Sequence, residues 1–387
     1  MKHLFALPSF VLWTTLIAFG CASTTAPTPQ DTAGGDTSPA VDTAAPADTT
    51  AAPDTAVSPE DTAGPTEPYT ITVFDQERIN STGDVNVRNI TADVDFAGHP
   101  FASVIMTVSL GSTCYPFDQW TQPPAGHNWP ADCDAFDRNF EFTMDDPKEE
   151  GDPPAFELVR AITPFGGPLQ FEVDITDLAN ARPGAHTIRA HISTWSDGAG
   201  QVTGSAGGWT VSASIAVTPG KAPRNVLAAI PLFNHMHGKL EEPAKATFTL
   251  PEGTVGAILE YRVTGHGGGD ATSGCIGPAE EFCKRQHDLW VDGEVLDSII
   301  PWRDDCASLC TLTPHPNGFD YCLENPCGSI QSVKAPRANW CPGSVTPPVT
   351  WIPQSYNGPG EHTFSYDIPN QADGSWRVSA VVYAYGP

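Results

Sequence analysis

Positive charge is what this sequence most lacks. Its 387 residues include 19 lysines and arginines against 46 aspartates and glutamates, which gives a formal net charge of −27. A surface of that average sign repels the phosphates of nucleic acids and the head groups of anionic membranes. Nucleic-acid binding is therefore excluded, and we expect membrane contact only through an anchor at the N-terminus.

An apolar stretch long enough to cross a membrane is also missing. The run from Leu4 to Phe19 follows Lys2 at the start of the chain, whereas a spanning helix needs about 20 apolar residues. We interpret residues 1–23 as an export signal. The string Ala18-Phe19-Gly20-Cys21 resembles the lipobox of bacterial lipoproteins, which implies acylation at Cys21 and an outer-membrane or cell-surface location. Ordinary secretion with cleavage nearby is the alternative.

The next segment, 24–68, has almost no large apolar side chain. It is built from Thr, Ala, Pro and Asp, and it carries eight acidic residues and no basic one. Such a composition cannot bury enough apolar surface to offset the entropy of ordering a chain. We therefore predict a disordered, self-repelling linker between the signal and a folded part.

From Tyr69 onward, long helical patterns are absent and alternation with period two dominates. Apolar residues recur at every second position in 104–110 and 211–217, and 35 glycines and 38 prolines supply frequent breaks. This pattern predicts half-buried strands of an all-β protein. The break at Thr218–Pro223 separates two segments of sandwich size. We expect two antiparallel β sandwiches, an N-terminal domain at 69–220 and a C-terminal domain at 221–387.

Cysteine usage fits export. Cys21 leaves nine further cysteines, an odd number, so at least one is unpaired or pairs with another molecule. Proximity suggests the pairs Cys114–Cys133 and Cys275–Cys283, and we expect Cys306 and Cys341 in disulfides too. The spacings Cys306–Cys310 and Cys322–Cys327 leave a structural zinc site as the less favoured alternative.

Three short strings combine acids, arginines and aromatic residues. They are Cys133–Arg138 (Cys-Asp-Ala-Phe-Asp-Arg), Ala279–Cys283 (Ala-Glu-Glu-Phe-Cys) and Arg337–Gly343 (Arg-Ala-Asn-Trp-Cys-Pro-Gly). Taken alone, each is more typical of a surface ion pair or a solvated turn than of an active site. In this order, however, they resemble the peptide-N-glycosidase F family, amidases that remove N-linked glycans from asparagine, over about residues 69–387.

The resemblance implies a fold and a set of roles. It implies two antiparallel jelly rolls side by side, with the site in the cleft between them. Asp137 corresponds to the principal catalytic aspartate, the general base for the attacking water, and Glu281 to a second acid that contacts the first sugar. Arg138 and Arg337 correspond to arginines that hold these acids and stabilise the developing oxyanion.

The remaining implied positions concern substrate binding. Trp195 and Trp340 are placed to stack on sugar or peptide. Ser193 stands where the family has a glutamate, so a charge that would pair with the neighbouring arginine is missing. Either that arginine finds another acid, or the site is electrostatically altered. The resemblance implies no metal and no cofactor; we expect a monomer whose partner is an N-glycosylated protein or peptide.

Two alternatives stay open. A non-catalytic glycan- or protein-binding surface lipoprotein on the same scaffold is favoured by the change at Ser193. His235-Met236-His237 places two histidines on one side of a strand, which could bind copper or zinc with His266 as a candidate third ligand. We expect instead a turn or a surface pair at these histidines.

Overall fold

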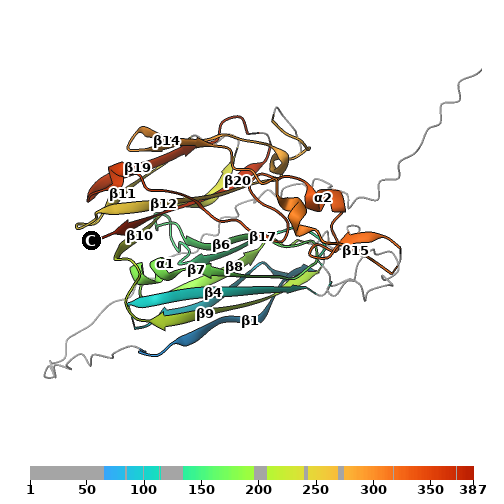
Figure 1. Ribbon diagram of the computed structural model, residues 1–387, viewed down its shortest axis with the longest axis horizontal. Helices are drawn as coiled ribbons and strands as arrows, with labels where there is room; N and C mark the ends of the chain where they lie inside the picture. Colours follow the sequence, from blue (N-terminus) through green and yellow to red (C-terminus); the bar gives the residue numbers. More distant parts are fainter. Residues whose placement is uncertain are drawn as a thin grey trace, which may run out of the picture.

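The described structure is almost entirely β. In the computed structural model (Figure 1), it covers residues 65–387 except 83–84, 99, 113, 115–133, 196–206, 239–242, 269–273, 317 and 372. The predicted export signal, Cys21, Cys133 and all of the predicted linker except residues 65–68 lie outside these residues. No helix among the described residues is long and apolar enough to span a membrane.

The first sandwich consists of two five-stranded antiparallel sheets. One has the order β2 (Val85–Val87), β1 (Tyr69–Thr82), β9 (Gly208–Pro219), β4 (Phe101–Ser112), β7 (Leu169–Asp174). The other has the order β17 (Ser344–Val345), β6 (Phe156–Ile162), β5 (Asn139–Met144), β8 (Gly184–Ile192), β3 (Asn89–Phe96). Strand β17 therefore reaches the first sandwich from the far end of the sequence.

The second sandwich consists of two four-stranded antiparallel sheets. One has the order β10 (Val226–Gly238), β20 (Ser375–Tyr385), β12 (Gly256–His266), β18 (Val349–Trp351). The other has the order β11 (Ala244–Leu250), β19 (Gly360–Asp367), β13 (His287–Val291), β14 (Glu294–Ile299). The prediction of an all-β chain made of two antiparallel sandwiches is confirmed.

Short elements occupy the connections. The helices are α1 (Thr176–Ala181) and α2 (Ile330–Lys334), and the 3-10 turns are η2 (Glu280–Phe282), η3 (Cys306–Leu309) and η4 (Gln354–Tyr356). A hairpin of β15 (Leu312–Pro314) and β16 (Asp320–Cys322) completes the set. In Figure 1, α2 and β15 lie together at one end of the two stacked sandwiches.

Period-two alternation produces the two cores. Val104, Met106 and Val108 on β4 are completely buried, and they lie beside their buried partners Val217, Ile215 and Ala213 of the neighbouring strand β9. In the second sandwich, the fully buried side chains include those of Leu259, Tyr261, Val263, Val378 and Val382. Each core removes one face of every central strand from water, which is the main favourable term in folding.

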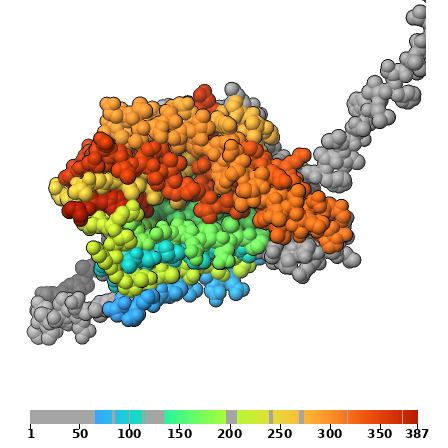
Figure 2. All heavy atoms as spheres, viewed as in Figure 1, coloured from blue at the N-terminus to red at the C-terminus, as the bar shows by residue number. Residues whose placement is uncertain are grey.

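A buried ionic network joins the two sandwiches. Arg160 on β6 pairs with Glu157 at 2.7 Å and donates to the backbone oxygens of Arg262 on β12, at 3.2 Å, and of Arg377 on β20. Glu157 also lies 3.5 Å from the guanidinium of Arg262 and accepts from Ser379. Figure 2 shows the two halves stacked in contact over their length. This network fixes how the second sandwich sits on the first.

The charge of Glu157 is stabilised by its arginines. Burial raises the pKa of this carboxyl, but Arg160 and Arg262 lower it further, and the net pKa lies below the ordinary glutamate value. Glu157 is therefore an anion at neutral pH although its side chain is only 1% exposed. A buried charge of this kind is tolerated only while its partners stay in place.

Disulfides bear out part of the cysteine prediction and correct another part. Cys275 pairs with Cys283 as expected, and Cys306 with Cys341. Cys310 pairs with Cys322, which was not foreseen. The alternative of a zinc site is wrong, because these disulfides take up three of its four sulfurs. Cys114 is disulfide-bonded, while its expected partner Cys133 lies outside the described residues. Disulfides of this number fit a protein of an oxidising compartment.

We predict that Arg160→Met lowers the free energy of unfolding by about 3–5 kcal/mol, because it leaves Glu157 buried without its nearest cation. Chemical denaturation measures this loss. Arg182→Met is the matched control: Arg182 is 47% exposed and pairs with Asp145, whose side chain is 33% exposed, so its loss should cost about 1 kcal/mol or less. Equal losses in the two variants would show that the network does not hold the sandwiches together.

Candidate active site

Asp137 and Arg138 lie in the loop that leads into β5. This loop is tied to the chain after β6, since the backbone of Arg138 donates to Thr163 Oγ1 at 2.8 Å and Thr163 Oγ1 donates to the backbone oxygen of Phe136 at 3.1 Å. Asp137 is 20% exposed and Arg138 is buried. The loop therefore holds one acid that is mostly buried but still reaches solvent, and the neighbouring cation in the interior.

Arg138 pairs with an acid of its own string. Its Nη2 and Nε lie 2.9 and 3.1 Å from the two carboxylate oxygens of Asp134, and both side chains are almost completely buried. The guanidinium carbon also lies 5.0 Å from the ring centre of Phe136 and 5.2 Å from that of Trp195. Asp134 is therefore the acid that pairs with Arg138. The absence of a carboxylate at Ser193 does not leave this arginine without a partner.

Two adjacent glutamates of η2 have opposite surroundings. Glu280 is completely buried, whereas the side chain of Glu281 is 24% exposed. The backbone oxygen of Glu281 accepts from the amide of Ala338 at 2.7 Å. Only Glu281 is accessible to a substrate, so the structure distinguishes two residues that look alike in the sequence.

Arg337 joins the two candidate acids. Its Nη2 lies 3.6 Å from Asp137 Oδ2, and its Nε lies 4.0 Å from Glu281 Oε1. The remaining donors point into α2 and its end, to the backbone oxygens of Ser332 at 2.6 Å and Ala335 at 3.1 Å. Asp137 from the first sandwich and Glu281 from the second are therefore brought together beside one cation that is 1% exposed.

Local backbone geometry and aromatic packing fix Arg337. Its guanidinium carbon lies 4.7 Å from the ring centre of Trp340 and 5.0 Å from that of Phe282. Asn339, between Arg337 and Trp340, has a φ of +66°, a left-handed conformation that asparagine tolerates better than most residues. Its side chain donates to the backbone oxygen of Val263 at 2.8 Å. The guanidinium is thus preorganised by its own segment.

Burial dominates the electrostatics of the two acids. It raises the pKa of Asp137 to about 6, although the Arg337 guanidinium opposes this shift. It likewise raises the pKa of Glu281 to about 7, with a further rise from the nearby Asp137 carboxylate and an opposing effect of Arg337. Two carboxyl groups that lose their protons close to neutral pH are suited to proton transfer.

The predicted stacking residues differ in their accessibility. Trp195 is half-buried and packs 5.4 Å from the ring of Phe136, beside Arg138. Trp340 is only 2% exposed, its Nε1 donates to Gly265, and its ring stacks on His266. The expectation that Trp340 stacks on sugar or peptide is therefore wrong in this structure, because its indole is covered. It supports Arg337 instead.

Ser193 lies directly after β8, where its amide donates to the backbone oxygen of Asn139 at 3.1 Å. Asn139 is two residues beyond Asp137, so Ser193 lies close to the candidate site along the chain pairing, just past the end of the adjacent strand β8. The serine is half-buried. A small, neutral side chain therefore occupies the place where the sequence resemblance led us to expect a glutamate.

His235 and His237 both contact the hydroxyl of Tyr366. His235 and His237 lie on the same side of β10, as expected, and the hydroxyl of Tyr366 lies 2.6 Å from His235 Nε2 and 3.4 Å from His237 Nδ1. His266, the candidate third ligand, instead stacks on Trp340 and contacts Thr264 Oγ1 at 2.7 Å. His237 is buried and His235 is half-buried, and both lie in a strand and contact Tyr366, so they are not the expected turn or surface pair.

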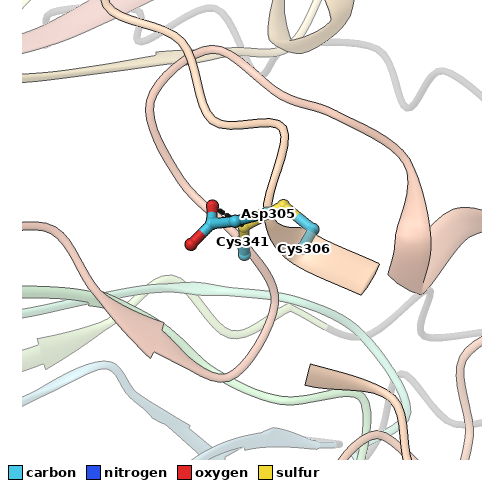
Figure 3. Close-up of side chains that lie close together, drawn as sticks. All are labelled: Asp305, Cys306 and Cys341. Atoms are coloured by element: carbon cyan, nitrogen blue, oxygen red, sulfur yellow. Dashed lines mark hydrogen bonds between the residues drawn. A yellow bond between two sulfur atoms is a disulfide. The ribbon is translucent and has the colours of Figure 1, made fainter. Parts of the chain in front are cut away.

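One other group resembles a metal site by proximity alone. Asp305 lies beside Cys306 and Cys341, with Asp305 Oδ1 3.8 Å from Cys341 Sγ (Figure 3). The two sulfurs are bonded to each other, so neither is a thiolate that could bind a metal. Asp305 is engaged by Arg303 at 2.7 Å. This cluster is therefore a disulfide beside an ion pair.

Three residues of the site were not assigned roles from the sequence: Asp134, Ser332 and Glu280. Asp134 carried no usable signal, because the rule that pairs an acid with an arginine four residues later applies to helices and residues 134–138 form a loop. Ser332 carried none either, because only the turn after α2 brings its oxygens to Arg337. Glu280 could not be separated from Glu281 without knowing which side chain turns inward.

Comparisons with known proteins bear on the family and the fold. Residues 234–383 match the family described as peptide-N-glycosidase F, C terminal. The fold is similar to that of PNGF-II, with 20% identity and a TM-score of 0.61 over 83% of this chain and 66% of that chain, so this chain spans about two thirds of that protein. A search of curated proteins returned no match.

A second similar structure is PNGase F, a glycosylasparaginase from Flavobacterium meningosepticum. The identity is 18% and the TM-score 0.58, over 83% of this chain and 96% of that chain. A structure of peptide-N(4)-(N-acetyl-beta-D-glucosaminyl) asparagine amidase gives 18% identity and a TM-score of 0.59 over the same shares. These likenesses show the fold, and they confirm the expected pair of jelly rolls.

We predict that Asp137→Asn and Glu281→Gln each make the protein more stable at pH 8 and leave its stability unchanged at pH 4. In the folded protein, both pKa values are raised, so the native state binds more protons than the unfolded state and stability falls as pH rises through about 4 to 7. Removing either charge should recover roughly 1–3 kcal/mol at pH 8. Denaturation at both pH values measures this; a loss of stability at pH 8 would contradict the assignment of the raised values.

Proposed function

We propose that this chain, a peptide-N-glycosidase F-like protein by its fold and by the family match of residues 234–383, is an amidase that hydrolyses the bond between a glycan and asparagine. The observation that carries the proposal is the meeting of Asp137 and Glu281 beside Arg337. These acids are encoded 144 residues apart in different sandwiches. The substrate would be an N-glycosylated protein or peptide.

Asp137 acts as the general base. Its carboxylate accepts a proton from a water molecule while the water oxygen forms a bond to the carboxamide carbon of the substrate asparagine. The bond from that carbon to the amide nitrogen then breaks, and the nitrogen leaves with a proton as a glycosylamine. The asparagine becomes an aspartate. A pKa of about 6 leaves Asp137 ionised, and so able to act, at neutral pH.

The arginines supply fixed positive charge. Arg337 is only 1% exposed, so its charge acts through space, from beside both acids, on the negative charge that develops on the carboxamide oxygen. Its position is set by α2 and Trp340 before substrate arrives. Arg138 is ion-paired with Asp134, so its effect is indirect: it stabilises the conformation of the loop that carries Asp137. A guanidinium suits this task because it stays charged at every relevant pH.

Glu281 binds the first sugar and orients it. Its carboxylate is partly exposed and faces the same cation as Asp137, so it can accept a hydrogen bond from a sugar hydroxyl next to the reacting bond. Trp195 offers an aromatic face beside Arg138 for the glycan or the peptide. Ser193 presents a neutral hydroxyl to the same region, where it adds a hydrogen-bonding group without charge.

Export places this activity outside the cytoplasm. The disulfides fit an oxidising compartment, and the N-terminal sequence resembles a lipoprotein signal. We extend the proposal to a protein anchored through a lipid on Cys21 at the cell surface or outer membrane. The acidic linker would then keep the two sandwiches away from the membrane.

A non-catalytic glycan- or protein-binding role is the second candidate, favoured by Ser193. The two candidates are separated by incubating the purified protein with a denatured glycoprotein and examining its peptides by mass spectrometry. We expect glycosylated asparagine to be converted to aspartate, with a mass gain of about 1 Da over the free asparagine. Binding without conversion would favour the second candidate.

We predict that Asp137→Asn lowers kcat by about 10²–10⁴-fold, the usual contribution of a general base. Folding is checked by circular dichroism, and Asp304→Asn, a change at an exposed aspartate of the second sandwich, serves as the control for the loss of one carboxylate. If Asp137→Asn keeps the activity of the parent protein, Asp137 is not the base.

The pH dependence follows from the two raised pKa values. Activity requires ionised Asp137, so kcat/KM should rise with pH through about 6, and ionisation of Glu281 should extend the rise to about 7. Rates at fixed ionic strength between pH 4 and 9 measure this limb. A profile that is flat between pH 5 and 8 would rule out both acids as the groups that control the reaction.

A further inference from the structure

Glu280, the buried neighbour of Glu281, has a carboxylate that is held by hydrogen bonds from two side chains. Its Oε1 accepts from Arg285 Nε at 2.8 Å and from Trp376 Nε1 at 3.0 Å, and its Oε2 accepts from Arg285 Nη2 at 3.2 Å. The side chains of Glu280 and Arg285 are 0% and 3% exposed. Three fixed donors therefore hold this carboxylate in one place in the interior of the second sandwich.

Glu280 and Glu281 share a single turn. In η2 the amide of Phe282 donates to Ala279 and that of Cys283 donates to Glu280, both at 2.9 Å, and the Cys275–Cys283 disulfide closes the segment behind it. Consecutive side chains of a 3-10 turn point about 120° apart. With Glu280 held inside, Glu281 has to point outward.

The same turn is joined to the segment of Arg337. The backbone oxygen of Glu281 accepts from Ala338 at 2.7 Å, and the amide of Glu280 donates to Gly267 at 2.8 Å. A movement of Glu280 would therefore displace the backbone of Glu281 and strain its hydrogen bond to the segment of Arg337. We propose that Glu280 is a positioning residue, whose buried carboxylate sets the place and the solvent exposure of the Glu281 carboxylate.

Close packing around Glu280 supports this role independently of its charge. A Cβ added at Gly374 would lie 2.3 Å from the Cβ of Glu280 and 2.4 Å from the backbone oxygen of His266. Only glycine lets the chain before β20 come so near to η2. Two kinds of contact therefore hold the turn: hydrogen bonds to the Glu280 carboxylate, and close packing of the Gly374 backbone against Glu280.

Buried ion pairs contribute little to stability on average, because desolvation offsets their attraction. The Glu280–Arg285 pair is therefore better explained by the geometry that it imposes than by the stability that it adds. The groups facing Glu281 are Asp137 and Arg337, and both lie on other segments. Their effect on Glu281 depends on where η2 holds it.

The test uses three variants that disturb this support differently. Trp376→Phe removes one donor and keeps the ion pair, Gly374→Ala pushes on Glu280 sterically, and Glu280→Gln removes its charge. Glu294→Gln, at an exposed glutamate of the same sandwich, is the matched control. Circular dichroism and thermal melting establish which variants fold.

The first measurement is the titration of the Glu281 carboxyl by NMR of carbon-13-labelled protein, with Glu281→Gln used to assign its signal. We expect its pKa to fall from about 7 toward the ordinary glutamate value in each folded variant, because a loosened turn admits water to a carboxyl whose pKa is raised mainly by burial. Glu294→Gln should leave the titration unchanged. An unchanged titration in Trp376→Phe and Gly374→Ala, with both proteins folded, would overturn the proposal.

The second measurement rests on the proposed function. We expect kcat to fall by about 10–100-fold in the same variants, with a smaller change in KM, since displacing a reacting group by about 1 Å can cost that much. The acidic limb of the pH profile should move to lower pH by the shift found in the titration.

A loss of melting temperature with both titration and pH profile unchanged would leave Glu280 with a structural role only. If the parent protein has no amidase activity, the proposed function fails, while the titration still decides the role of Glu280.

Discussion

The packing between the two sandwiches, where charged groups lie beside apolar contacts such as Ala229 and Val381, is the constraint on which the rest of this structure depends. Each sandwich has its own apolar core, but the faces that meet between them carry Arg160, Glu157, Arg262 and Arg377. Charged groups in such a place have few acceptable arrangements, because each must meet a partner when it leaves water. The interface is therefore specific in register as well as stable, and it determines which loops of the two sandwiches face each other.

The candidate site is a consequence of that register. Asp137 and Glu281 meet at a distance set by Arg337, and both carboxyls have raised pKa values because burial opposes their charge. The folded protein thus holds two acids in an environment that disfavours their ionised forms. Such a cost is typical of functional sites, where stability is given up for chemical competence. The apolar cores, and the aromatic rings that pack on Arg337, offset this loss of stability.

Several features were correctly predicted because they depend on local sequence. Alternation in 104–110 and 211–217 predicted strands, and those residues are buried as their spacing requires. The Cys275–Cys283 disulfide follows from proximity in the chain. Other expectations failed where long-range packing decides. Trp340 was expected to face the substrate, yet its indole is covered, and the zinc alternative failed because Cys310 pairs with Cys322.

The sequence by itself determined that this is an acidic, disulfide-bonded all-β protein with acids and arginines in three short strings. Those properties follow from composition and from periodicity along the chain, which act over a few residues. Tertiary structure alone decided that Arg138 is committed to Asp134, that Glu281 and not Glu280 reaches the surface, and that Arg337 joins acids from two sandwiches. The reason is that burial and charge pairing depend on residues far apart in the chain, and only the folded interface brings them within reach of one another.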